Sequence, residues 1–282
     1  MLMRKPQLAK DYAERFLPEF PLLVQPKLDG VRCIVNTDLS CWCKPRTGKD
    51  LVQHKPHIAR LLGSVIDTKM MEELGGCLDG ELFVPGMYFE DIVSGVKAET
   101  SEYARAIKYY IFDFMHEEMT FNSRYSKLLW WHSKCCRTVP FFQDMVFIVP
   151  AKYAHDMADL KTLHAHNDKH YEGSIIRNPM SCYAFGKRNR DLMRWKMFKD
   201  AEYVVKDIVD GKGKNVGIST FVCVTRSGKE FRADSTGSRE QRMKWFTDRD
   251  KIIGKEVTVS FQNISKYGIP RFPKVKAVRD YE

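Results

Sequence analysis

Hydrophobic positions change their spacing several times along the first 200 residues, and each spacing predicts a different element. Alternating positions rich in β-branched residues predict strands at Leu22–Gln25, Val31–Asn36, Gly76–Val84, Lys108–Met115, Glu172–Arg177 and Leu192–Phe198. Helical spacing predicts helices at Lys55–Leu62, Asp67–Leu74, Ser123–Cys136 and Ala154–Asn167. Strands mixed with helices at uneven intervals indicate an α+β fold with mostly antiparallel sheets.

The pattern changes near Asp200, after which short strands dominate. These strands are predicted at Tyr203–Val209, Phe221–Thr225, Glu230–Asp234, Lys255–Asn263 and Pro273–Val278, with a helix at Ser238–Asp248. Five short strands with one helix fit an all-β oligonucleotide-binding (OB) barrel better than a sandwich. We therefore expect two domains, residues 1–200 and residues 201–282.

Composition narrows the class of protein further. The 282 residues are 44% hydrophobic and 29% charged, which is a globular mixture with enough apolar material for a core. No apolar run approaches the roughly 20 residues that a helix needs to span a bilayer. The first residues also lack the apolar stretch of a secretory signal. We therefore expect no membrane partner and no disordered tail.

The charge of the chain points to a polyanionic partner. Lys and Arg outnumber Asp and Glu by 46 to 36, and the excess is denser in the C-terminal part. Clustered cations gain free energy by releasing the counterions of nucleic-acid phosphates. The eight cysteines lack zinc-ligand spacing, since Cys41 and Cys43 are one residue apart and Cys135 and Cys136 are adjacent. We expect them to be reduced thiols, mostly buried.

The segment Lys27-Leu-Asp-Gly-Val-Arg32 carries the most informative chemistry. A lysine leaves one predicted strand, a glycine permits a tight turn, and an arginine lies on the returning strand. This places a possible nucleophile beside a carboxylate and a guanidinium suited to phosphate. Taken alone, the segment also fits an ordinary hairpin turn with exposed charges.

Six further segments follow in order along the chain. They are Pro45–Thr47, Leu78–Leu82, Tyr109–Asp113, Glu172–Arg177, Leu192–Lys196 and Gly268–Pro273. Together with Lys27–Arg32 they resemble the ordered motifs of ATP-dependent DNA ligases, within the covalent nucleotidyltransferases. In its size the chain is similar to minimal viral and phage ligases, which consist of an adenylation domain and an OB domain.

The resemblance implies an activity and its cofactors. The expected reaction is ATP-dependent sealing of nicks between a 3′-OH and a 5′-phosphate in duplex DNA, during replication or repair. It proceeds through a lysyl-AMP and then a DNA-adenylate, and it requires Mg²⁺ or Mn²⁺. The expected partner is nicked duplex DNA, bound by a monomer in the cytoplasm, or in the host's cytoplasm if the source is a virus or phage.

The resemblance also assigns catalytic roles. The implied set is Lys27, Asp29, Arg32, Arg46, Glu81, Glu172, Arg194, Lys196 and Arg271. Lys27 is the nucleophile, which must lose a proton from an amine of pKa about 10.4. Arg194 and Lys196 lie two apart on a strand and supply positive charge, although the family has lysine where Arg194 stands. The resemblance implies that Asp29 acts on the 3′-OH of the nick during sealing. It implies that Arg271 orients the pyrophosphate leaving group during the first step.

Further residues are assigned to ligands. The implied nucleotide contacts are Gln25 at the adenine edge, Phe112 stacked on adenine, and Lys27, Arg32, Glu81 and Lys196. The implied metal ligands are Asp79, Glu81 and Glu172, because carboxylates near a phosphate require a cation between them. The expected DNA contacts are Arg32 and Arg46, including the 5′-phosphate, and the basic loop residues Lys187 and Arg188.

Other activities remain open on sequence alone. An mRNA-capping guanylyltransferase shares the lysine motif and the barrel, but Pro270–Pro273 and the small size favour a DNA ligase. RNA ligases generally lack a barrel with this terminal motif. A non-catalytic nucleic-acid-binding protein is the remaining alternative, which the joint presence of Lys27, Glu172 and Lys196 disfavours.

Overall fold

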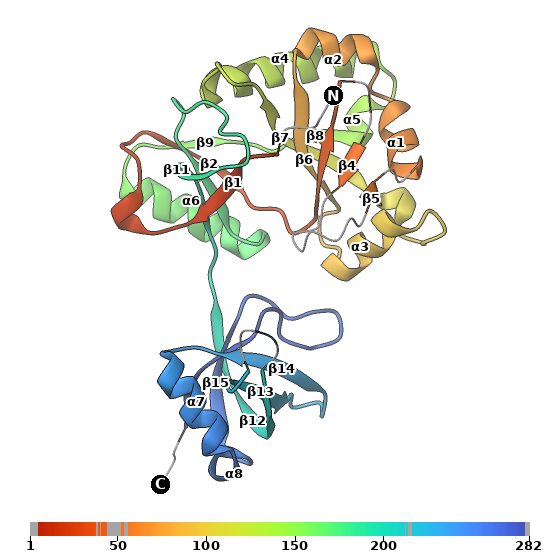
Figure 1. The fold of residues 1–282 in the computed structure, drawn as a ribbon. Coiled ribbons are helices and arrows are strands. Elements are labelled where there is room, and N and C mark those ends of the chain that lie inside the picture. The colour runs from red at the N-terminus through yellow and green to blue at the C-terminus, as the bar shows by residue number, and fades with distance from the viewer. Residues whose placement is uncertain are drawn as a thin grey trace. The chain divides into compact units, whose positions relative to one another are not determined.

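The computed structural model describes residues 5–37, 39, 41–43, 52–53, 56–211, 213 and 216–279 (Figure 1). The chain divides into two compact units, Met1–Lys196 and Met197–Glu282. This division falls four residues before the expected boundary at Asp200, because the first barrel strand already begins at Lys199. Each unit is described below by itself.

One sheet of the first unit carries the lysine segment. Its strand order is β1 (Leu8–Asp11), β11 (Arg188–Trp195), β10 (Ser174–Arg177), β2 (Leu22–Pro26) and β9 (Lys152–Ala154). The pair of β1 with β11 is parallel, and the other pairs are antiparallel. Helix α6 (Met157–His170) packs on β2 through an apolar cluster that includes Leu22, Leu160 and Ile176.

A second sheet of this unit is covered by helices (Figure 1). Its strand order is β5 (Val52–Gln53), β4 (Cys41–Cys43), β3 (Val31–Val35), β6 (Cys77–Phe83), β7 (Lys108–Met115) and β8 (Val146–Ile148). The helices are α1 (Pro56–Gly63), α2 (Thr68–Leu74), α3 (Phe89–Lys97), α4 (Phe121–Thr138) and α5 (Phe142–Met145). Single turns of 3₁₀ helix lie at Glu14–Phe16 and Ala104–Ala106.

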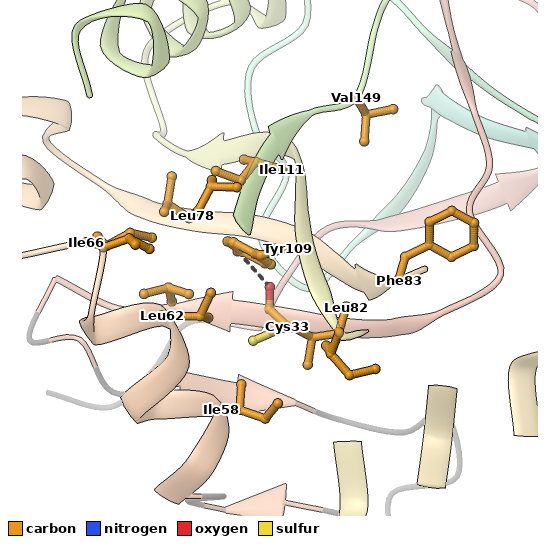
Figure 2. Packing of buried hydrophobic residues seen from close by; sticks show 14 of the residues in the cluster. Cys33, Ile58, Leu62, Ile66, Leu78, Leu82, Phe83, Tyr109, Ile111 and Val149 are labelled. Carbon is orange, nitrogen blue, oxygen red and sulfur yellow. Dashed lines mark hydrogen bonds between the residues drawn. The ribbon is translucent and has the colours of Figure 1, made fainter. Parts of the chain in front are cut away.

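A tyrosine crosses the centre of this second sheet (Figure 2). The Tyr109 hydroxyl on β7 donates a hydrogen bond of 3.0 Å to the carbonyl oxygen of Cys33 on β3, across the intervening strand β6. Gly80 on β6 makes this possible, since a Cβ there would lie 2.7 Å from the Tyr109 ring. Close packing therefore explains why this position inside β6 is a glycine. Asp79 and Gly80 both belong to the strand and do not form a turn.

A buried charge network joins the two sheets of the first unit. Asp113 on β7 accepts hydrogen bonds of 2.7 and 3.0 Å from Arg124 on α4. Arg177 on β10, in the other sheet, donates to the same carboxylate at 2.9 Å and to Gln25 Oε1 at 2.7 Å. The Asp113 side chain is 0% exposed, and Arg124 and Arg177 are 1% and 5% exposed. Buried charges are tolerated only when paired in this way.

The second unit is a closed barrel. Its strand order is β12 (Lys199–Asp210), β13 (Ser219–Val224), β14 (Glu230–Ser235), β16 (Lys274–Val278) and β15 (Glu256–Phe261). Helix α7 (Arg239–Thr247) begins after Ser238, whose side chain accepts a hydrogen bond from Gln241 N, and α8 (Arg249–Ile252) follows. Trp245 on α7 packs edge-on against Phe221 in the barrel core.

The α+β class and the OB barrel predicted from sequence are confirmed. The helix predicted from Ala154 starts instead at Met157, because Asp156 caps it. The strand predicted at Leu192–Phe198 is wrong in its bounds and runs over Arg188–Trp195.

Two other expectations concern cysteines and the membrane. Six cysteines have side chains that the structure describes, all of them free, and three of these are buried: Cys33, Cys135 and Cys223. Cys41 and Cys43 lie on β4, but their side chains are outside the described residues. None of the helices described has both the length and the apolar character required for a membrane crossing.

The Asp113 network predicts a large loss of stability when its acid is removed. Asp113→Ala leaves two buried guanidinium groups without their carboxylate, so we expect the free energy of unfolding to fall by about 3–5 kcal/mol. Urea titration measures this change. Glu102→Ala, at an exposed acid, is the matched control and should alter stability by no more than about 0.5 kcal/mol. Equal stability of the two variants would contradict the assignment.

Candidate active site

Backbone hydrogen bonds place Lys27 beside Glu172, which lies 145 residues farther along the chain. Lys27 follows the end of β2, and Glu172 precedes β10, the strand that pairs antiparallel with β2. Lys27 N donates to Gly173 O, and Glu172 N donates to Lys27 O, each at 2.9 Å. The two residues therefore extend the β2–β10 ladder, and their relative position is fixed by the backbone.

Gly173 is required where three segments of chain converge. It has φ +133°, and a Cβ at this position would lie 2.2 Å from the carbonyl oxygen of Trp195. A residue with a side chain would both strain the backbone and push β11 away. The glycine after Glu172 thus lets the end of β11, and Lys196 with it, lie against the Lys27 turn.

The carboxylate of Glu172 lies between two lysines. Its Oε2 contacts Nζ of Lys27, and its Oε1 contacts Nζ of Lys196. The exposed fractions of the three side chains are 5% for Glu172, 21% for Lys27 and 11% for Lys196. Burial alone would raise the pKa of Glu172, but the charges of Lys27 and Lys196 outweigh it and lower that pKa to about 2. Glu172 is therefore ionised at neutral pH.

Arg32 belongs to a second charged cluster, which lies near the cluster of Lys27, Glu172 and Lys196. Its guanidinium donates to both oxygens of Asp79 at 2.8 and 2.5 Å, and to Gln7 O at 2.9 Å. These bonds use three of its five N–H groups and leave two for a phosphate. Burial by itself would lower the pKa of Arg32, but the charge of Asp79 outweighs burial and raises that pKa. Arg32 therefore stays protonated.

The structure gives Asp79 partners other than a metal ion. Besides its bidentate contact with Arg32, its Oδ2 accepts a 2.6 Å hydrogen bond from the hydroxyl of Tyr183. Burial and the Asp79 charge raise the pKa of Tyr183, which keeps this hydroxyl a donor. Both oxygens of Asp79 thus accept hydrogen bonds from neighbouring side chains, and its role as a metal ligand stays a prediction. Tyr183 itself had no signal in the sequence.

Glu81 is the other carboxylate of the pocket. It is the register partner of Arg32 across β3 and β6, and it feels the charges of Lys27 and Arg32. Burial is nevertheless the dominant effect and raises the pKa of Glu81 to about 8, with a further contribution from the neighbouring Glu172. The Glu81 carboxyl is therefore mostly protonated at neutral pH.

The two residues predicted to contact adenine differ in their surroundings. Gln25 is buried, and its amide is fully engaged: Nε2 donates to Phe112 O and Val149 O, each at 3.3 Å, while Oε1 accepts from Arg177. The geometry therefore favours a structural role for its side chain rather than contact with adenine. Phe112 is half-buried, with the guanidinium of Arg32 at 5.5 Å from its ring centroid.

The remaining predicted residues lie in several places. Arg194 pairs with Asp11 on β1 at 2.6 Å. Asp29 lies in the turn after Lys27, whereas Arg46 lies outside the described residues. Lys187 and Arg188 are exposed, and Arg188 donates to the carbonyl of Ala9. The roles of these residues stay predictions.

Arg271 lies in the second unit, on the hairpin that connects β15 and β16. Its backbone N donates to Asn263 O at 2.7 Å, and its guanidinium lies 5.6 Å from the ring centroid of Phe272. Its proposed action on pyrophosphate also stays a prediction.

A buried lysine–carboxylate cluster in a unit that precedes an OB barrel is typical of covalent nucleotidyltransferases. Residues 6–196 match the family described as ATP dependent DNA ligase domain, and residues 210–279 match the DNA ligase OB-like domain. The chain therefore belongs to the ATP-dependent DNA ligase family. The predicted activity is confirmed, and ATP is the nucleotide that it implies.

One curated protein and two solved structures illustrate what this chain is similar to. A DNA ligase of Haemophilus influenzae is 25% identical over 200 residues, which cover 69% of each chain. The fold resembles a solved Lig E DNA ligase with a TM-score of 0.76 and 22% identity, covering 99% of this chain and 100% of that one. It also resembles a Chlorella virus DNA ligase–adenylate with a TM-score of 0.53 and 24% identity over 99% of both chains.

The raised pKa of Glu81 predicts a pH-dependent stability. In the unfolded chain this carboxyl ionises near the ordinary value of 4.5, but in the folded chain it keeps its proton up to about pH 8. Between these values folding takes up a proton, so its contribution to stability falls as pH rises through that window. Melting curves of the wild type and Glu81→Gln from pH 4 to 9 measure the difference.

We expect the melting temperature of the wild type, relative to Glu81→Gln, to decrease steadily up to about pH 8 and then level off. Other titrating groups cancel in this comparison, because both proteins contain them. A difference that does not change with pH would show that Glu81 ionises normally in the fold.

Proposed function

We propose that the chain seals nicks between a 3′-OH and a 5′-phosphate in duplex DNA through an AMP group carried on Lys27. The observation that carries this proposal is the contact of Lys27 Nζ with Glu172, held by backbone hydrogen bonds of both residues. A lysine whose side chain is 21% exposed, next to a second lysine and an arginine, is suited to attack a bound triphosphate.

In the first step, Nζ of Lys27 attacks the α-phosphorus of ATP. The bond from nitrogen to phosphorus forms as the bond from phosphorus to the pyrophosphate oxygen breaks. Nζ must lose a proton before it has a lone pair to donate. Glu172 orients Nζ, and Lys196 on the other oxygen of the same carboxylate places a positive charge beside the phosphates. Phe112 offers its ring to adenine.

The later steps transfer AMP to DNA. The 5′-phosphate at the nick attacks the lysyl-AMP, which frees Lys27 and forms a DNA-adenylate. The 3′-OH then attacks the 5′-phosphorus, and AMP leaves. Arg32 has two N–H groups that its bonds to Asp79 and Gln7 do not use, and these can bind the 5′-phosphate. The exposed side chains of Lys187 and Arg188 can contact the DNA backbone.

A divalent cation fits the carboxylates of this pocket. Burial keeps Glu81 protonated despite the charges of Lys27 and Arg32, so an added cation would favour its ionised form, whereas Glu172 is already ionised. These two would hold Mg²⁺ or Mn²⁺ together with phosphate oxygens, since Mg²⁺ commonly takes one or two carboxylates plus substrate phosphates. Among the described residues, no three His, Cys, Asp or Glu form a metal cluster. The cation would neutralise charge on the triphosphate.

A labelling experiment tests the proposal. The protein is incubated with α-³²P-labelled ATP and Mg²⁺, and then chased with nicked DNA. We expect covalent label on the wild type and none on Lys27→Ala. The label should pass from the protein to DNA and then to free AMP as the nick closes. Lys169→Ala, at an exposed lysine on α6, is the matched control and should label like the wild type.

Other outcomes would contradict the proposal in different ways. Label from GTP instead of ATP would indicate capping chemistry. Label that persists in Lys27→Ala would place the nucleophile elsewhere. Label that never leaves the protein when nicked DNA is added would show that this DNA is not the acceptor.

A further inference from the structure

Three aromatic rings from separate segments of the first unit form a stack next to Lys196, which contacts Glu172. The ring of Trp195, at the end of β11, lies between Tyr12 and His164. Its centroid is 4.1 Å from that of Tyr12 and 3.9 Å from that of His164, with interplanar angles of 4° and 14°. Rings so close and so nearly parallel confine the Trp195 side chain on both faces.

Both outer rings are tied to backbone or side chains next to Trp195. Tyr12 N donates to Arg194 O at 2.9 Å, which joins the Tyr12 segment to the residue before Trp195. His164 Nδ1 lies 3.0 Å from Ser174 Oγ, and Ser174 is the register partner of Trp195 on β10. Asn167 Nδ2 donates to the same hydroxyl at 3.1 Å, so α6 is attached to this strand pair at two positions.

The burial of His164 costs free energy, and stacking on Trp195 gives a reason for burying it there. Its side chain is 4% exposed, and Nε2 is a buried nitrogen for which the described structure offers no hydrogen-bond partner. A buried polar atom without a partner costs free energy, so such a residue is retained for a specific reason. The ring contacts of Tyr12, Trp195 and His164 are with one another and not with Lys27 or Glu172. The stack does lie next to Lys196, and this position accounts for keeping a histidine whose buried nitrogen has no partner among the described residues.

Lys196 needs an anchor because the regular strand stops before it. Strand β11 ends at Trp195, and the compact first unit ends at Lys196, where the chain passes into the second unit. The ammonium of a lysine lies at the end of four rotatable bonds, so its position depends on a fixed Cα. The carbonyl oxygen of Trp195 lies very close to Gly173, because a Cβ added to this glycine would be only 2.2 Å from that oxygen. The backbone at Trp195 therefore packs tightly against the segment that carries Glu172.

We propose that Tyr12, Trp195 and His164 form a positioning stack that fixes Lys196 against Glu172 and thereby accelerates adenylation of Lys27. The stack acts through Lys196 and contacts no substrate. It holds Lys196, the last residue of the first unit, in place at the point where the chain passes into the second unit. This inference rests on the proposed lysyl-AMP chemistry.

The test is single-turnover adenylation with labelled ATP at saturating concentration, which gives both a rate constant and a final amplitude. Trp195→Leu removes the central ring but keeps an apolar side chain. We expect its rate constant to fall by about 10²-fold at full amplitude, because a small displacement of a positioned group has an effect of that size. Trp195→Phe keeps a ring between Tyr12 and His164 and should recover most of the rate.

A purely structural role would give a different result. Partial unfolding lowers the amplitude, because less protein is competent, and leaves the rate constant of the folded fraction unchanged. Tyr12→Leu, at the partly exposed outer ring, is a second variant in case Trp195→Leu does not fold, and its rate constant should also fall. Tyr153→Leu, at an exposed ring that stacks on His155 in the same unit, is the matched control and should keep the wild-type rate.

A double-mutant cycle shows whether the stack acts through Lys196. In a Lys196→Ala background, Trp195→Leu should cause no further loss of rate. Multiplicative losses, or a wild-type rate constant for Trp195→Leu, would overturn the positioning stack. Wild-type labelling that depends on Lys27 is measured in the same series, so a failure of the lysyl-AMP chemistry would be seen separately, as absent label in every protein.

Discussion

The arrangement of the first unit depends on one carboxylate that lies between two ammonium groups. Glu172 is nearly buried, and an ionised acid in such a place is stable only if positive charges remain beside it. Lys27 and Lys196 supply them from the turn after β2 and from the end of β11. The same interaction gathers the proposed nucleophile and a second cation suited to a phosphate at one point. The charge balance that stabilises the pocket is thus also the arrangement that the chemistry needs.

The surrounding scaffold keeps this arrangement from relaxing. Asp113 binds Arg124 and Arg177 and so links the helix-covered sheet to the sheet that carries Lys27. Arg177 also holds Gln25, two residues before Lys27. The Arg32–Asp79–Tyr183 cluster fixes the strand on the other side of the turn. Each cluster pairs its buried charges internally, which leaves Glu81 as a carboxyl that burial keeps protonated.

The sequence predicts the segments well and their contacts poorly. Periodicity located β7 at its observed bounds, and the turn at Lys27–Arg32 follows from its glycine and flanking strands. The pairing of Lys27 with Glu172 could come only from resemblance to a family, because strand register between distant segments has no local signal. The start of β11 was missed because Arg188 and Asn189 are polar and pair with β1 through the backbone. Tyr183 was missed since an isolated aromatic residue in a loop predicts nothing specific.

The central claim is that Glu172 organises the two lysines for adenylation of Lys27. Single-turnover labelling of Glu172→Gln with α-³²P-ATP, beside a melting curve of the same protein, tests it most directly. We expect the variant to fold and its rate constant to fall by about 10²-fold or more, because an amide cannot hold two ammonium groups in place. A folded Glu172→Gln protein that is adenylated on Lys27 at the wild-type rate would contradict the account.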